Sequence, residues 1–253
     1  MSFWTLLSLL LIVTWAGLAG AWQLAHSWRW IQLSADAARR HGPPPRVLWA
    51  LTVALGAAGA LVFLVLARAW QATPALGLDR WAAELARAAW SPGAQAWMLP
   101  LTHLGDPITL WALAGVVALG LWWRHERWLA FAWLATLAGN ALWNPGLKLV
   151  FERLRPVPDV SGLLAKGYSF PSGHSSGAMV VYGMLAYLAF RLLPLRWHLP
   201  ALLMAATLIL AIGASRVFLQ AHFATDVMAG FALGGVWLAL CIALCSTRLA
   251  RGP

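Results

Sequence analysis

Charged side chains are scarce in this sequence. They make up 10% of its 253 residues, only eight residues are acidic, and 61% are hydrophobic. Soluble domains carry roughly 25% charged residues, so the low charge and a mean hydropathy of +0.71 exclude a soluble domain and predict an all-α integral membrane protein. A membrane span needs about 20 apolar residues, which leaves room for roughly six to eight spans.

Cysteine is also rare, and acidic residues are not clustered. Cys241 and Cys245 are the only cysteines, and inside an apolar run such thiols behave as small hydrophobic groups. No group of carboxylates is spaced to hold Mg²⁺, so we expect no metal and no cofactor. The net charge of +10 is explained by loops and helix ends that face anionic headgroups, and we expect no nucleic-acid partner.

Apolar runs predict about seven membrane spans. The N-terminal run lacks the positively charged start of a signal peptide, and we expect it to remain as the first span. A basic connector that contains Pro43, Pro44 and Pro45 follows it. Residues 78–90 predict an amphipathic helix at the membrane interface, with Asp79, Arg80, Glu84 and Arg87 on its polar side. The predicted spans are 6–24, 47–70, 107–123, 128–147, 174–193, 199–215 and 225–246.

Three polar stretches interrupt the apolar pattern, and the first of them covers residues 148–156. Lys148 and Arg155 are seven residues apart, so a helix would present both cations on one face until Pro156 ends it. Two aligned cations favour an anion with several oxygens. The alternative is that both side chains bind headgroups at the end of a span.

The second stretch, residues 171–174, opens a helix. Free backbone N–H groups and the helix dipole favour an anion there, Ser172 adds a hydroxyl donor, and Gly173 permits close approach. His174 follows in the first turn. Taken alone, the stretch is also explained as a capped helix start.

The third stretch, residues 215–226, contains Arg216, His222 and Asp226. His222 and Asp226 are four residues apart, and in a helix the carboxylate would accept one imidazole N–H and leave the other nitrogen as a nucleophile. A surface His–Asp pair is the alternative interpretation. Ionisable groups beside a span are expected to be functional.

Alternation of the spans predicts that all three stretches meet on one side of the membrane. The opposite side carries ten of the eighteen basic residues. By the positive-inside rule, the polar site faces away from the cytoplasm and the C-terminus lies inside.

Together, the three stretches resemble the motifs of the type 2 phosphatidic acid phosphatase superfamily, in its bacterial membrane-embedded branch. The resemblance covers Lys148 to Asp226 and implies a six-helix phosphatase domain in residues 47–253. Residues 1–46 would then add one N-terminal transmembrane helix and the basic connector. It further implies that His222 attacks phosphorus, that Asp226 orients it, and that His174 serves as acid and then base. The phosphate oxygens would be held by Lys148, Arg155, Ser172, Gly173 and Arg216. Residues 102–106 lie on the same side, and His103 is a candidate at the mouth of the site.

The resemblance predicts a metal-independent lipid phosphate or pyrophosphate phosphatase of the bacterial inner membrane, acting on a lipid that stays in the bilayer. Undecaprenyl pyrophosphate and glycerophospholipid phosphates, such as phosphatidylglycerol phosphate or phosphatidic acid, are the expected substrates. The alternatives are a lipid phosphotransferase, a lipid A phosphatase, and a lipid-binding protein without activity. The sequence assigns no oligomeric state.

Overall fold

The computed structural model describes residues 2–32, 45–72, 77–156 and 167–250, and within these ranges it contains helices and no strands. This confirms the predicted all-α class. Residues 33–44, which belong to the predicted basic connector, lie outside the described residues. The helices are α1 (Phe3–Gln32), α3 (Pro45–Ala72), α4 (Gly77–Ala88), α5 (Pro92–His103), α6 (Pro107–Trp123), α7 (Arg127–Phe151), α8 (Gly173–Leu192), the short η1 (Leu195–Trp197), α9 (His198–Phe218) and α10 (Ala224–Ala250).

Five of these helices are long and apolar enough to cross a membrane singly: α1, α3, α8, α9 with η1, and α10. A sixth span forms if α5 and α6, which meet at a bend of 47°, are counted together. The predicted fourth span corresponds to α7, which has 25 residues. It does not reach the same mean hydropathy, because Asn140, Asn144 and Pro145 interrupt its apolar sequence. The structure therefore has five or six candidate spans where the sequence predicted seven.

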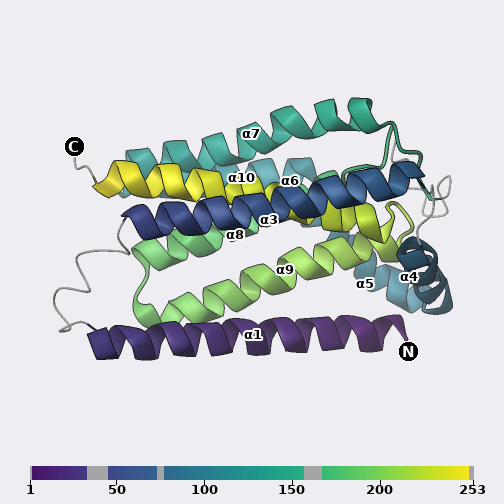
Figure 1. Cartoon of the computed structure of the whole chain (residues 1–253), viewed down its shortest axis with the longest axis horizontal. Coiled ribbons are helices and arrows are strands. Elements are labelled where there is room, and N and C mark those ends of the chain that lie inside the picture. The colour runs from purple at the N-terminus through teal and green to yellow at the C-terminus, as the bar shows by residue number, and fades with distance from the viewer. Residues whose placement is uncertain (1, 33–44, 73–76, 157–166, 251–253) are drawn as a thin grey trace.

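Long helices run alongside one another and form the core (Figure 1). The helix α10 packs against α3 and α8, while α8 also packs against α9 and α7. Large side chains such as Trp133, Met184 and Ile212 fill the centre, and the Trp133 Nε1–H donates to the carbonyl of Ala114 over 2.9 Å, which joins α7 to α6.

Two glycines bring α10 unusually close to α8. A Cβ atom on Gly230 would lie 2.6 Å from the carbonyl oxygen of Ser172, and one on Gly234 would lie 2.9 Å from that of Ser176. Only glycine permits this backbone approach. The approach places the start of α10 directly beside the start of α8.

The short helices α4 and α5 gather at one end of the bundle, beside the end of α9 and on the same side as the N-terminus, whereas the C-terminus lies at the other end (Figure 1). The extra N-terminal helix α1 lies along α9. Phe3 packs against Phe218 with ring centroids 5.4 Å apart, and the Trp15 Nε1–H donates to Thr207 Oγ1 over 2.9 Å.

Candidate active site

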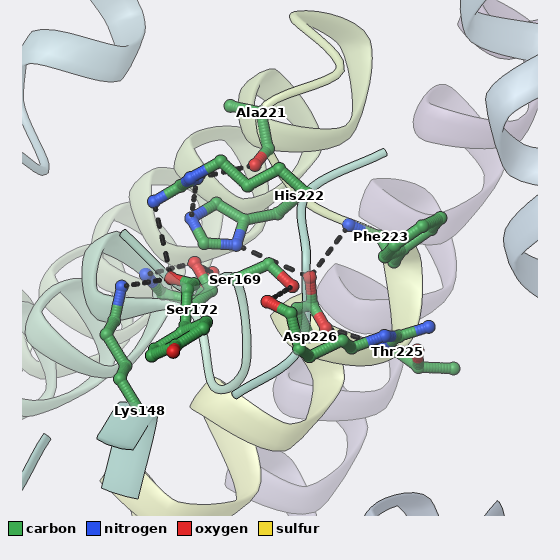
Figure 2. A network of polar contacts seen from close by, with 12 residues as sticks. Lys148, Ser169, Ser172, Ala221, His222, Phe223, Thr225 and Asp226 are labelled. Atoms are coloured by element: carbon green, nitrogen blue, oxygen red, sulfur yellow. Dashed lines mark hydrogen bonds and ion pairs between the residues drawn. The ribbon is translucent and has the colours of Figure 1, made fainter. Parts of the chain in front are cut away.

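The three polar stretches of the sequence meet at the end of the bundle that carries α4 and α5. They come from the end of α7, the start of α8, and the connection from α9 to α10 (Figure 2). Backbone contact joins two of them, since the N–H of Ser172 donates to the carbonyl of Asp226 over 3.0 Å. The predicted convergence on one site therefore occurs, although the local geometry differs from the prediction in several places.

Lys148 and Arg155 do not lie on one helix face, contrary to the prediction. The helix α7 ends at Phe151, and Glu152 takes up a left-handed conformation with φ of 48°. This turn reverses the chain before Pro156 is reached. Lys148 Nζ and Arg155 Nη2 nevertheless both point to the carbonyl oxygen of Tyr168, at 3.2 and 3.5 Å. Two cations thus converge through a turn and not through helical periodicity.

Arg216, near the end of α9, supplies a third cation. Its Nη1 donates to Thr102 Oγ1 over 2.8 Å, and both side chains are buried. The buried Nε–H of Arg216 has no hydrogen-bond partner among the described residues. A buried guanidinium with an unused donor is suited to bind an anion, because leaving a buried donor unpaired is costly.

The start of α8 is a capped helix N-terminus. Ser172 is the N-cap residue, and its hydroxyl oxygen accepts hydrogen bonds from the N–H and the hydroxyl of Ser175. Its predicted contact with phosphate stays a prediction. Gly173 is packed closely, since an added Cβ would lie 3.2 Å from Asn144 Oδ1. His174 follows in the first turn of α8.

His222 lies in the turn between α9 and α10, so it does not share a helix face with Asp226 as the sequence predicted. Its Nε2 is 3.3 Å from Arg155 Nη1. Because a guanidinium has only donors, Nε2 must be the unprotonated nitrogen. The proton then resides on Nδ1, which is 3.5 Å from Asp226 Oδ2.

Burial and surrounding positive charge keep His222 neutral. Burial is the largest cause that lowers its pKa well below the ordinary value, followed by the charges of Arg216, Arg155 and Lys148. A desolvated imidazole among cations disfavours a further positive charge. The lone pair on Nε2 is therefore available for a nucleophilic role at neutral pH.

Asp226 is held by groups that the sequence analysis did not assign to the site. Its Oδ1 accepts a hydrogen bond from Arg153 Nη1 over 2.6 Å, and its Oδ2 accepts one from the N–H of Phe223 over 3.0 Å. The ring of Phe223 also covers the guanidinium of Arg153, whose Cζ is 4.1 Å from the ring centroid. Arg153 is itself buried.

Asp79 of α4 completes this network from the other side. Its Oδ2 accepts from Arg153 Nη2 over 2.7 Å, and its two carboxylate oxygens accept from the N–H and the hydroxyl of Thr225 over 2.9 and 2.8 Å. Asp79, predicted on the polar side of an interfacial helix, is instead buried and only 1% exposed. The helix α4 is thereby tied to the catalytic candidate Asp226.

The connection between α5 and α6 also contributes to the site. Thr102 binds Arg216, and Asp106 Oδ1 lies 2.6 Å from His174 Nε2. His103, the candidate at the mouth of the site, contacts the other oxygen of Asp106. Residues 102–106 were predicted on the side of the site, with His103 as the candidate; for Thr102 and Asp106 that shared side was the available signal.

Comparisons with known proteins identify the family of the chain. The model of the PAP2 superfamily matches residues 128–249. Phosphatidylglycerophosphatase B of Bacillus subtilis (strain 168) is 34% identical over 177 residues, which are 69% of this chain and 86% of that protein. The crystal structure of a transmembrane PAP2-type phosphatidylglycerolphosphate phosphatase from Bacillus subtilis has a TM-score of 0.71 and 31% identity, and the match covers 78% of this chain and 98% of that chain.

These matches extend over the helices that carry all three polar stretches. The chain belongs to the PAP2 superfamily, and it is a membrane-embedded lipid phosphate phosphatase of that family.

Proposed function

We propose that this protein removes the terminal phosphate from a glycerophospholipid phosphate, with phosphatidylglycerol phosphate as the first candidate, through a phosphohistidine on His222. The observation that carries the mechanism is the state of His222: neutral, with its Nε2 lone pair 3.3 Å from a guanidinium nitrogen of Arg155. The names of the two Bacillus subtilis relatives support the choice of substrate.

The reaction proceeds in two displacements. His222 Nε2 attacks phosphorus, the bond from phosphorus to the lipid oxygen breaks, and His174 gives a proton to that oxygen. A water molecule then attacks the phosphohistidine while His174 takes up one of its protons, and inorganic phosphate leaves. Asp226 Oδ2 lies 3.5 Å from His222 Nδ1, too loosely placed for a hydrogen bond in this structure, and its charge attracts the Nδ1–H, which keeps Nε2 directed at phosphorus.

The cations stabilise the charge that develops on the transferred phosphoryl group. Lys148, Arg155 and Arg216 reach the site from three different segments, and such preorganised charges act strongly where water is excluded. Ser172 and the N–H of Gly173 add donors at the start of α8, where the helix dipole also favours an anion. All of these groups recognise phosphate, whereas the tail of the lipid remains beside the helices in the bilayer.

The site faces the outside of the cytoplasmic membrane, with the C-terminus inside. Arg124, Arg127, Arg191 and Arg196 adjoin the helix ends remote from the site, as the positive-inside rule requires for this orientation. A tag at the C-terminus should stay inaccessible to a membrane-impermeant protease in intact cells. Cleavage of that tag would show that the C-terminus lies outside and that the proposed orientation is wrong.

The function is tested with the purified full-length protein and a panel of lipid phosphates, in the presence of a chelator. We expect release of inorganic phosphate, fastest from phosphatidylglycerol phosphate, and no release by His222→Ala. A matched control is His125→Asn, because His125 lies in the turn between α6 and α7, remote from the site.

The other outcomes separate the alternatives. Faster release from undecaprenyl pyrophosphate would change the substrate and keep the mechanism. Transfer of labelled phosphate to a second lipid without free phosphate would identify a phosphotransferase. Activity that requires Mg²⁺, or that survives His222→Ala, would refute the mechanism.

A further inference from the structure

The connection between α5 and α6 brings a second carboxylate to the site. Asp106 Oδ1 lies 2.6 Å from His174 Nε2, and Asp106 Oδ2 lies 2.5 Å from His103 Nδ1. The side chains of His103, Asp106 and His174 are 53%, 32% and 18% exposed. A series of side-chain contacts therefore runs inward from His103 at the surface through Asp106 to His174. His174 is the histidine that the proposed function uses as acid and base.

The contacts define which edge of the His174 ring remains available. A Cβ atom on Gly105 would lie 3.2 Å from His174 Cδ2, so the edge formed by Cδ2 and Nε2 rests against residues 105 and 106. Nδ1 lies on the opposite edge of the ring. Within the described part of the chain, the contacts of His174 include no hydrogen-bond partner for Nδ1.

Asp106 is ionised throughout the physiological range. The hydrogen bond with His174 is the largest cause that lowers the pKa of Asp106 to about 2. An ionised carboxylate can only accept hydrogen bonds, so the adjoining Nε2 must carry a proton. In the neutral ring of His174 Nδ1 then presents a lone pair, and in the imidazolium Nδ1 carries the proton that can be given away.

We propose that Asp106 is a positioning residue of the reaction: it holds the Nε2–H of His174 so that Nδ1 is the atom that exchanges protons with the substrate. The inference rests on the proposed function, since it explains how His174 performs the role given to it there. His103 donates to the second oxygen of Asp106 and holds the carboxylate in place. The site thus contains two oriented histidines, His222 with Asp226 and His174 with Asp106.

The proton balance is complete at each step. In the first displacement, the imidazolium of His174 gives the Nδ1 proton to the lipid oxygen as its bond to phosphorus breaks, and the neutral ring keeps the Nε2 proton on Asp106. In the second, Nδ1 takes a proton from the attacking water as the bond from phosphorus to His222 breaks. The imidazolium is thereby restored, and Asp106 keeps its charge throughout.

The test compares two small phosphomonoesters of similar shape. Dinitrophenolate leaves without a proton, whereas phenolate needs one, so only phenyl phosphate depends on a general acid during phosphorylation of His222. The purified full-length wild-type protein and its Asp106→Asn, Asp106→Glu, His103→Gln and Glu152→Gln variants are assayed for kcat/KM on both. Glu152 is a matched control, because its carboxylate is exposed and, among the described residues, accepts a hydrogen bond from the Tyr168 hydroxyl and does not contact His174.

We expect Asp106→Asn to lower kcat/KM for phenyl phosphate by about 10²-fold or more, and that for dinitrophenyl phosphate by no more than about threefold. Because water activation also depends on His174, dinitrophenyl phosphate should give a burst of dinitrophenolate followed by slow turnover, with phosphohistidine accumulating. Asp106→Glu should restore part of the loss, His103→Gln should show a smaller loss of the same pattern, and Glu152→Gln should show none.

Three results would overturn this inference. An equal loss on both esters would mean that Asp106 does not act through the leaving group. Unchanged kinetics would remove its role entirely. A lower KM with kcat retained would show that the carboxylate competes with phosphate for the site. Failure of the proposed function is distinguishable, because it requires that wild type release no phosphate or that His222→Ala retain activity.

Discussion

Replacing Arg153 by methionine should impair both folding and catalysis, because this guanidinium lies between two buried carboxylates. Asp79 and Asp226 are 1% and 0% exposed, and Arg153 Nη2 and Nη1 contact them at 2.7 and 2.6 Å. Methionine has a similar length, but it removes the guanidinium that lies over the ring of Phe223 and leaves two negative charges uncompensated. Breaking a buried ion pair in this way costs about 3–5 kcal/mol.

The catalytic loss follows from the same contacts. In the proposed mechanism Asp226 orients His222, and without Arg153 the carboxylate loses its shortest hydrogen bond. A displacement of about 1 Å in a reacting group can cost roughly 10²-fold in rate. We expect kcat of Arg153→Met to fall by about that factor, with a much smaller change in KM because the phosphate-binding cations remain.

Stability can be measured by heating the detergent-purified protein with a thiol-reactive dye, since Cys245 is buried and Cys241 partly buried. Adding Asp79→Asn to Arg153→Met removes one of the two unpaired charges, so the double variant should be more stable than Arg153→Met alone. Arg68→Met is the matched control, because Arg68 is exposed at the end of α3. Equal stability and kcat in Arg153→Met and Arg68→Met would refute the role given to this network.

Three further predictions concern packing, phosphate binding and pH. Gly230→Ala should lower stability by about 1–3 kcal/mol and reduce activity, because its methyl group would press on Ser172 O at 2.6 Å; unchanged thermal unfolding would contradict this. Thr102→Val removes a hydrogen bond worth about 1 kcal/mol from Arg216, so KM should rise about fivefold, and an unchanged KM would be evidence against this contact. The pKa of His222 is lowered on folding, so the unfolded chain binds more protons below its ordinary pKa of about 6.5. The stability of wild type relative to His222→Ala should therefore decrease as the pH is lowered from about 7 to 5. A stability difference that does not change with pH would refute the burial of a neutral imidazole.

Hydropathy alone was sufficient to predict the class of protein and most helix positions. The predicted spans 174–193, 199–215 and 225–246 correspond to α8, α9 and α10 within a few residues, because a run of about 20 apolar residues has few alternatives to a membrane helix. The predicted number of seven spans differs from the five or six candidate spans of the described residues. Asn140 and Asn144 are tolerated inside α7 because they are buried against neighbouring helices, and composition does not report which face of a helix is covered.

The motifs of the candidate site were also visible in the sequence, but the route by which each residue reaches it was not. Arg155 was expected on the face of α7, and the chain instead turns back at Glu152. The pair formed by His222 and Asp226 was expected on one helix, and His222 lies in the preceding turn. In each case the residues converge through tertiary contacts that a helical spacing rule does not contain.

The sequence by itself determined that this is a helical membrane protein whose three polar stretches lie at one end of the bundle, since hydropathy and the alternation of spans depend only on the order of residues. Only the tertiary structure decided which other charges belong to the site. Asp79 and Arg153 are 74 residues apart, and Asp106 and His174 are 68 apart. A charged residue near a helix end looks the same in the sequence whether it is hydrated or paired with a buried residue of opposite charge. Which of the two occurs depends on the residues that the fold brings beside it.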